Sequence, residues 1–422
     1  MLGTADRKPQ PLARISAASA RAGPARAPAR APVDAVSPYR FRFVTSPAAL
    51  SAIGADWGEL EIRAGSRFNY FQTFEWVSNW YRHVGAPDGA ELMILTARRD
   101  GRLEMVWPLM VVRQNGLRVV KWLSEPHLQY GDVLAADGPG LTALLDDAWS
   151  LIQTRGHHDV IALGKVLSTA RVHSFLKRRC PVACNASAAS QLDLSGFDSC
   201  QGFLKALGRP RRKRHTQRYN RIAKLGDLDF TVHLGGEAQA RVVAQAFVFK
   251  RDWLEQNGLL SQTVFEAESA RFIASLSTPV GDRPQMAVAE MTLDGAPIAI
   301  EIGFIFKRHY YAYMGAFDWA WREHSPGKVQ MREMICWCIN NGMDQYDFLG
   351  TPAAYKSEWT DLEIGMRDFC APATLRGAVY ARLWLARLRP LAKAAFERLT
   401  PARRRAVLGT VGRLTARPRA SA

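Results

Sequence analysis

Residues 296–359 read APIAIEIGFIFKRHYYAYMGAFDWAWREHSPGKVQMREMICWCINNGMDQYDFLGTPAAYKSEW. The two apolar runs at 297–306 and 309–316 predict strands. An acidic, aromatic loop follows them, and an apolar-faced helix is predicted over 326–339. The short run QYDFLG at 345–350 predicts another strand. This order of strand, strand, helix and strand indicates an α/β fold.

The start of the predicted helix has the chemistry of an anion-binding site. Ser325 is suited to the N-cap, Pro326 to the first helical position, and Gly327 allows close backbone approach. Free amides and the helix dipole at this end attract an anion. Lys328 lies where a helix normally prefers an acid, so an offsetting anion such as pyrophosphate is expected. We predict Ser325, Gly327, Lys328 and Val329 as cofactor-binding residues; a capped helix with a solvated lysine is the alternative.

The strand at 345–350 and the segment after it carry further candidates. Asp347 lies in the strand, and TPAAYKSEW after it predicts a turn into another helix with Tyr355 and Lys356. A phenol and an amine beside an anion-binding helix could protonate a leaving group or hold a phosphate. A surface lysine and a half-buried tyrosine are the alternative.

The first half of the chain repeats this order of elements. Asp100-Gly101 and Asp294-Gly295 each join two apolar runs, and such pairs tolerate the positive φ of a hairpin turn. The two turns lie 194 residues apart, and each is followed by a predicted strand, helix and strand. Duplication of one α/β unit is the interpretation that we favour, with two unrelated hairpins as the alternative.

Composition divides the chain into four predicted segments. An Ala-, Pro- and Arg-rich tail at 1–38 has a composition that cannot bury enough surface to order itself, so we interpret it as a disordered leader, with an organelle transit peptide as the alternative. Two α/β domains follow at 39–200 and 201–375, the second one carrying the chemistry, and a basic amphipathic tail occupies 376–422. In the first domain, the aromatic stretch 68–85 predicts a helix capped by Thr73. The tryptophans of this helix would either pack in the core or form the wall of a ligand pocket.

The order of strand, SPGK helix, YDFLG strand and AAYKSEW resembles the CelD-like, cellulose-biosynthesis-associated branch of the GNAT acyltransferases, which is distantly similar to the two-domain Fem-type transferases. FQTFEWVSNWYRHVG at 71–85, MVWPLMVVR at 105–113 and QYGDVL at 129–134 extend the resemblance into the first half. The resemblance implies an α/β (α+β) fold of two tandem GNAT-like domains, with mixed, mostly antiparallel sheets covered by helices.

The same resemblance implies acyl transfer to an amine in polysaccharide or cell-envelope synthesis. Acetyl-CoA or another acyl-CoA would be the cosubstrate, without a metal, and its pantetheine would lie between splayed strands near 309–316 and 345–350. The acceptor, a small molecule or a glycan amine, would attack the thioester directly. Glu301 is the candidate base and Tyr355 the candidate acid, with Asp347 and Lys356 as further catalytic candidates.

Two alternatives to this function remain open. The pyrophosphate loop of acetyltransferases is normally a run of alternating Gln/Arg and Gly, and here it is only SPGK. A Fem-type transferase that uses aminoacyl-tRNA therefore stays possible, and so does a non-catalytic scaffold for a membrane-associated synthase.

The positive charge is concentrated in three segments. The net charge is +17, of which 1–40 carry +5, 205–224 carry +9 and 376–422 carry +11, which leaves −8 for the rest. This distribution argues against a protein whose whole surface binds a polyanion. The basic helix within 207–227 could hold phosphates of coenzyme A, a nucleotide-linked sugar or tRNA, or simply be solvated. The segment 376–399 predicts a basic interfacial helix broken by Pro390, or a docked helix with a cationic face.

The cysteines and the hydropathy point to the cytoplasm. The six cysteines lack zinc-ribbon spacing, so we expect buried free thiols in a reducing compartment. Cys336 and Cys338 cannot share a helix face and are interpreted as core. No apolar run reaches the length of a membrane span. We expect a cytoplasmic protein whose C-terminal tail could make peripheral contact with the inner membrane; the oligomeric state is not predicted.

Overall fold

The computed structural model describes residues 37–415, with gaps at 156, 278–284, 351–354 and 361. From Tyr39 onward the described residues belong to one compact unit. The strands are β1 (Arg40–Val44), β2 (Glu91–Leu92), β3 (Ile94–Arg99), β4 (Arg102–Trp107), β5 (Leu109–Gln114), β6 (Leu117–Trp122), β7 (Leu134–Ala135), β8 (Val160–Leu167), β9 (Val182–Asp193), β10 (Leu228–His233), β11 (Gln285–Leu293), β12 (Ala296–Phe306), β13 (His309–Phe317), β14 (Gln345–Gly350) and β15 (Leu362–Pro372).

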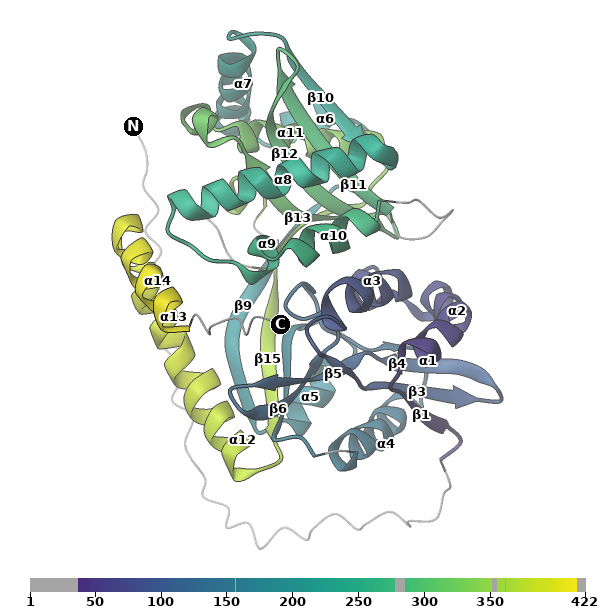
Figure 1. The fold of residues 1–422 in the computed structure, drawn as a ribbon. Coiled ribbons are helices and arrows are strands. Elements are labelled where there is room, and N and C mark those ends of the chain that lie inside the picture. The colour runs from purple at the N-terminus through teal and green to yellow at the C-terminus, as the bar shows by residue number, and fades with distance from the viewer. Residues whose placement is uncertain (1–36, 156, 278–284, 351–354, 361, 416–422) are drawn as a thin grey trace, which may run out of the picture. The chain divides into compact units, whose positions relative to one another are not determined.

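The helices lie between groups of these strands in the sequence (Figure 1). The α-helices are α1 (Pro47–Ala52), α2 (Gly54–Ala64), α3 (Phe74–Trp80), α4 (Leu141–Thr154), α5 (His173–Arg179), α6 (Cys200–Ala206), α7 (Arg209–Ala223), α8 (Gly236–Gln256), α9 (Gln262–Phe265), α10 (Ala267–Ser275), α11 (Pro326–Asn340), α12 (Leu375–Val379), α13 (Arg389–Glu397) and α14 (Pro401–Thr415). The 3-10 turns are η1 (Tyr70–Gln72), η3 (Trp319–His324) and η4 (Lys356–Glu358), and the π-helical segments are η2 (Tyr81–Gly85) and η5 (Tyr380–Leu388).

One large sheet runs through both halves of the unit. Its strand order is β10-β11-β12-β13-β14-β9-β15-β8-β6-β5-β2, and a smaller sheet has the order β1-β3-β4-β7. The neighbouring strands are antiparallel except for the pairs β13–β14 and β6–β8, which are parallel. The predicted mixed, mostly antiparallel sheet is therefore confirmed.

The predicted hairpins and the strand–helix–strand repeat are both present. Asp100-Gly101 joins β3 to β4 and Asp294-Gly295 joins β11 to β12, all four residues having positive φ. In the first half, β6 and β8 are parallel and connected through α4; in the second half, β13 and β14 are parallel and connected through α11. Each unit thus places a crossover helix between two parallel strands, as parallel pairing requires.

The two halves exchange their last strands. β9 follows the first half in sequence, yet it pairs with β14 of the second half. β15 ends the second half, yet it pairs with β8 of the first. β9 and β15 also pair with each other along most of their length, and they run side by side in Figure 1. A single continuous sheet results, so the boundary at residue 200 stays a prediction.

Helices α8 and α11 cover opposite faces of the second half. Along β12, Ile300 and Phe304 pack in the main core with Phe247 of α8. Ala299, the residue directly before Ile300, packs with Val329 of α11 in a separate cluster. Successive strand residues point to opposite faces, so this alternation places the two helices on either side of the sheet.

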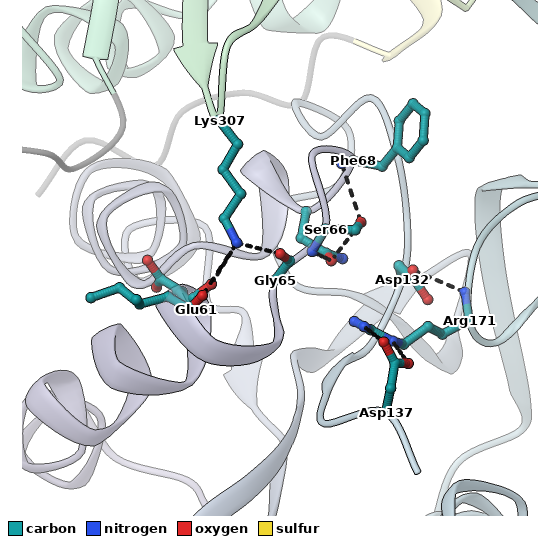
Figure 2. A network of polar contacts seen from close by, with 10 residues as sticks. Glu61, Gly65, Ser66, Phe68, Asp132, Asp137, Arg171 and Lys307 are labelled. Carbon is teal, nitrogen blue, oxygen red and sulfur yellow. Dashed lines mark hydrogen bonds and ion pairs between the residues drawn. The ribbon is translucent and has the colours of Figure 1, made fainter.

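Polar contacts also join segments far apart in sequence. Figure 2 shows Lys307, in the turn between β12 and β13, at the C-terminal end of α2. Its Nζ donates to the carbonyl of Glu61 at 3.1 Å and to that of Gly65. The same view shows the Arg171 backbone amide donating to Asp132. The Glu61 carbonyl also accepts from the Gly65 amide, so Lys307 adds a second hydrogen bond at this helix end, where a cation is favourable against the helix dipole.

The aromatic stretch of the first half belongs to the core. Thr73 caps α3, its Oγ1 accepting from the amide of Trp76, as predicted. Trp76 and Trp80 are almost completely buried. Their indole nitrogens donate to Ser124 and His127 respectively. These tryptophans therefore pack in the core rather than line the cavity described below.

The prediction of free thiols is wrong for two cysteines. Cys200 of α6 and Cys336 of α11 form a disulfide. They are 136 residues apart, so only the packing of the two helices brings them together. Cys338 is buried in a hydrophobic cluster, as expected of a core residue. Within the described residues, no group of His, Cys, Asp and Glu could hold a metal ion.

Two predicted features of the C-terminal region are also corrected. The segment after β14 does not enter a long helix: residues 351–354 lie outside the described part, and 356–358 form one 3-10 turn before β15. The break at Pro390 is absent, because η5 passes directly into α13 with helical backbone at Leu388 and Arg389. The Arg389 amide donates five residues back to Trp384, so the missing N–H of Pro390 falls where the hydrogen-bond pattern changes. In the described part of the chain, no helix is long and apolar enough to cross a membrane.

Candidate functional site

A cavity of about 700 Å³ opens where two parallel strands of the second half separate. β13 and β14 pair only from His309–Gln345 to Tyr311–Asp347. Beyond that point the strands diverge, and residues 312–317 of β13 and 348–350 of β14 line the cavity. The splay that the family resemblance implied is therefore present.

The cavity follows the free edge of β13. All six residues from 312 to 317 line it, although successive side chains of a strand point to opposite faces. Residues of α8 and of α11, which cover opposite faces of the sheet, also line it. The cavity thus passes through the sheet at the gap between the strands, where backbone groups can reach an extended ligand.

Glu301 lines this cavity from β12. It is 3 % exposed, and its Oε1 accepts hydrogen bonds from the hydroxyls of Tyr310 at 2.9 Å and Tyr346 at 2.7 Å. Among the described residues, Oε2 has no hydrogen-bond partner. Burial raises the pKa of this carboxyl, and the two tyrosine hydrogen bonds oppose that rise. A carboxyl with a raised pKa is suited to general base chemistry near neutral pH.

Tyr355 and Lys356 also line the cavity but differ in their surroundings. Tyr355 is partly exposed, and its pKa is raised by burial and then by the charge of Glu301. The Lys356 ammonium is buried and donates to the carbonyls of Phe348 at 2.8 Å and Leu349 at 3.0 Å. Burial lowers its pKa to about 8, against the opposing charge of Asp347. Tyr355 can donate a proton to a ligand, whereas Lys356 holds the diverging end of β14.

Asp347 does not line the cavity and is completely buried. Its Oδ1 accepts from the Tyr130 hydroxyl at 2.7 Å and from the Leu349 amide at 2.8 Å. Its Oδ2 lies 3.0 Å from both Gln191 Nε2 and His309 Nε2. Leu349 has a φ of 61°, so the carboxylate holds β14 in the conformation that turns its end away from β13.

The start of α11 forms another part of the cavity wall. Ser325, Gly327 and Lys328 line the cavity, whereas the Val329 side chain is buried in the core. The helix begins at Pro326 as predicted, but Ser325 has left-handed backbone and its side chain makes no capping bond. The predicted capping role of Ser325 is therefore wrong. Lys328 Nζ donates to Glu358 Oε1 at 2.7 Å, so the offsetting anion in this structure is a carboxylate of the chain itself.

Lys250 of α8 is a cavity residue that the sequence reasoning missed. Its Nζ donates to the Gly315 carbonyl at 3.0 Å and lies 4.8 Å from the centroid of the Trp253 ring. Burial lowers its pKa to about 8. The helical spacing could have identified it. Lys250 lies three residues after Phe247 and four after Ala246, on the apolar stripe of α8 that faces the sheet.

A family model described as acetyltransferase (GNAT) domain matches residues 209–357. No curated protein matches the sequence. Among solved structures, FemX has a TM-score of 0.52 at 13 % identity, covering 82 % of this chain and 99 % of that one. The C-terminal domain of a putative lysylphosphatidylglycerol synthetase from Agrobacterium fabrum has a TM-score of 0.50 at 14 % identity, covering 79 % and 95 %. L-PGS from Bacillus licheniformis has a TM-score of 0.50 at 10 % identity, covering 78 % and 95 %.

These comparisons support the predicted GNAT fold. They do not identify the CelD-like branch of that family. The second half contains a GNAT acetyltransferase domain, and the likeness to FemX extends through both halves. The chain therefore has a GNAT-type acyltransferase fold in a tandem arrangement. At these identities, the solved structures show the fold alone.

Proposed function

We propose that this chain is an N-acyltransferase that moves an acyl group, acetyl in the simplest case, from a coenzyme A thioester to an amine. The observation that carries the proposal is the position of Glu301, a buried carboxyl in the cavity that opens between β13 and β14. A GNAT domain over 209–357 supports the same chemistry, since such domains use acyl-CoA as cosubstrate.

The donor would occupy the gap between the strands. Its pyrophosphate would bind at the start of α11, through the Ser325 hydroxyl, the Gly327 amide and the Lys328 ammonium, with Val329 in the same turn, because the positive end of the helix dipole attracts phosphates. Its pantetheine would extend along residues 312–317, whose edge is not paired with β14. The thioester would then lie in the part of the cavity that Glu301 and Tyr355 line.

The reaction needs positioning and two proton transfers. The amine nitrogen attacks the thioester carbonyl, and its proton passes to the Glu301 carboxylate, directly or through water. The carbon–sulfur bond of the tetrahedral intermediate breaks, and the leaving thiolate takes a proton from the Tyr355 hydroxyl. Tyr355 carries this proton at neutral pH, because an ordinary tyrosine pKa already lies near 10 and burial raises the pKa of Tyr355 further. Exchange with solvent then restores both groups.

We extend the proposal to the amine acceptor and to the pathway in which the enzyme acts. The resemblance to CelD-like proteins favours an amino sugar or another small amine in polysaccharide or envelope synthesis, on the cytoplasmic side of the membrane. A screen of acyl-CoA and amine pairs for thiol release would identify donor and acceptor together.

Acyl-CoA binding is the direct test. Calorimetry with acetyl-CoA should show binding by the full chain, and Lys328→Glu should weaken it at least about tenfold, or ~1.4 kcal/mol. Lys224→Glu, an exposed change at the end of α7, is the matched control and should have little effect. Absence of binding for every acyl-CoA tested would contradict the proposal.

Fem-type aminoacyl transfer is the second candidate. It is favoured by the likeness to FemX and by α7, where Arg212, Lys213 and Arg214 are exposed beside the cavity-lining helix α11. Under this alternative, binding would follow charged tRNA and fall steeply with salt, because several phosphates would be neutralised. A small thioester would show a much weaker salt dependence.

A further inference from the structure

The helix that follows β15 has one face docked on the sheet. Gly377, Ala381 and Leu385 are buried at a spacing of four residues. Tyr380, Ala381 and Leu385 pack in a cluster with residues of β6, β8, β9 and β15. A Cβ on Gly377 would lie 1.8 Å from the carbonyl oxygen of Asp159, so the helix is held close to the sheet at its beginning. α12 contacts β15, and η5, the helical segment that follows it, contacts both β9 and β15 (Figure 1).

The opposite face of this helix exposes large apolar side chains. Leu375 is 83 % exposed and Leu391 is 68 % exposed, and further exposed apolar residues lie between these two in the sequence. The exposed apolar face consists of Leu375, Val379, Leu383, Trp384, Leu388 and Leu391. The π-helical segment, with more residues per turn than an α-helix, keeps residues four or five apart on the same side. This is why one face stays buried and the other stays apolar and exposed.

The exposed face borders a shallow hollow. Its volume is about 460 Å³, and it is lined by Leu375, Val379, Leu383, Trp384 and Leu388 together with residues of the β5–β6 hairpin. Arg376 ties the helix to that hairpin, donating to the Gly116 carbonyl at 2.9 Å. Contiguous exposed apolar surface of this kind marks an interaction site rather than ordinary surface.

The charge around the exposed apolar face indicates the kind of partner. Arg382, Arg387, Arg389 and Lys393 are exposed on the same helix. From 375 to 408 there are nine Lys or Arg residues and a single acid, Glu397. A second copy of the chain would bring like charges together, whereas an anionic surface would be attracted to all of them.

We propose that the exposed apolar face binds the surface of an anionic lipid bilayer. The apolar side chains enter the boundary between headgroups and acyl chains, and the flanking arginines and lysine contact lipid phosphates. The β9–β15 strand pair holds the helix from the other side, so the face is presented without unfolding. This inference is independent of the proposed acyl transfer.

Vesicle co-sedimentation of the full chain tests the proposal. With phosphatidylglycerol–phosphatidylcholine vesicles we expect most of the protein to pellet, with little binding to phosphatidylcholine alone and a loss of binding as salt rises. Leu375→Glu and Leu391→Glu should each reduce binding at least about tenfold, since each places an acid on the apolar face. Ile62→Glu is the matched control: Ile62 of α2 is 82 % exposed and lies away from this helix.

Three outcomes would overturn the proposal. One is the absence of binding to anionic vesicles, and another is equal loss of binding with Ile62→Glu. The third is a dimer of the wild-type chain in solution that Leu375→Glu converts to a monomer, which would make the face an interface between copies. Because the substituted side chains are already exposed, thermal melting should confirm that all variants remain folded.

Discussion

The Nζ atom of Lys328 lies 2.7 Å from Oε1 of Glu358. Arg218 of α7 holds the other carboxylate oxygen of Glu358 at 2.7 Å. Partial burial alone would raise the pKa of Glu358, but the hydrogen bonds from Arg218 and Lys328 outweigh it and lower the pKa to about 2. The first turn of α11 thus carries its own anion, and a donor pyrophosphate would compete with Glu358 for the same two cations.

Glu358→Gln should therefore tighten acyl-CoA binding. The substitution removes the competing charge and leaves Arg218 and Lys328 to the donor phosphates, and a charge-assisted hydrogen bond of this kind is worth enough to expect a gain of about tenfold. Calorimetry with acetyl-CoA measures it. Glu397→Gln, which removes an exposed acid on α13, is the control and should leave the affinity unchanged. Weaker binding by Glu358→Gln would show that the carboxylate orders the site instead.

Glu301→Gln should lower kcat and leave KM nearly unchanged. The glutamine oxygen can still accept from Tyr310 and Tyr346, so the geometry is kept while the base is lost, and general base catalysis contributes roughly 10²–10⁴ in rate. Steady-state kinetics with the acceptor found in the screen measures this. Glu290→Gln is the control, because Glu290 is buried on the neighbouring strand β11 and does not line the cavity. Full activity of Glu301→Gln would exclude Glu301 as the base.

The pH dependence of kcat/KM provides a separate check on Glu301. The base must be ionised in the free enzyme, and burial raises its pKa above the usual 4.5. Activity should therefore fall as the pH drops through that raised pKa, at a higher pH than for an exposed glutamate. This decrease of kcat/KM at low pH should be absent from the residual activity of Glu301→Gln. If the variant shows the same decrease, a group other than Glu301 is responsible for it.

Asp347→Asn should destabilise the fold without a selective effect on chemistry. Asp347 accepts hydrogen bonds from Tyr130, Gln191 and the Leu349 amide in a fully buried site. In asparagine, one of the two carboxylate oxygens is replaced by an NH₂ group, which donates and therefore cannot accept from them. We expect a loss of about 3 kcal/mol in the free energy of unfolding. Asp344→Asn, which removes an exposed ion pair with Arg308, should cost less than about 1 kcal/mol.

Urea titrations of the two aspartate variants give both values. The activity of Asp347→Asn, corrected for the fraction folded, should stay within a few fold of wild type. A large loss of kcat in fully folded Asp347→Asn would instead place the carboxylate in the chemistry.

Stability should decrease as the pH falls below about 6.5 because of His127. This buried histidine accepts from Trp80 on Nδ1 and contacts Ser269 Oγ through Nε2 at 2.8 Å. Burial, with the charge of Lys165, lowers its pKa to about 3 from an ordinary 6.5. The fold therefore favours neutral His127, and this stability, complete above pH 6.5, is lost as the pH drops towards 3.

The contribution of His127 to that loss should be ~1.4 kcal/mol between pH 7.5 and 5.5. Urea unfolding at the two pH values, on wild type and on His127→Gln, isolates it because glutamine does not titrate there. An identical pH dependence in the two proteins would assign the effect to other groups, such as His215, whose pKa is lowered to about 4 by burial.

Much of the local structure could be predicted because its causes are local. Positive φ at Asp100-Gly101 and Asp294-Gly295 is a property of the turn residues themselves. The boundaries of α11 and β14 follow from Pro326, from Asn341-Gly342 and from the apolar runs between them. Thr73 caps α3 through an amide three residues away. None of these features depends on which distant segment becomes a neighbour.

The candidate site was predicted in part. The sequence placed Glu301, Tyr355, Lys356, Ser325, Gly327 and Lys328 in one region, and all of them line the cavity. Asp347 and the Val329 side chain do not line it, because Asp347 joins a network with Tyr130 and Gln191 and Val329 faces the core. Lys250 comes from α8 on the other face of the sheet, and it reaches the cavity only because β13 and β14 separate.

By itself, the sequence determined β12, β13, α11 and β14, the Asp-Gly turns and the repeated order of strand, helix and strand, since periodicity and turn chemistry act over a few residues. Only the tertiary structure decided that β9 and β15 are exchanged, that Cys200 meets Cys336 and that Glu358 pairs with Lys328. These contacts depend on which strands and helices become neighbours. That choice is made by burial and pairing summed over the whole unit, which no short window of sequence contains.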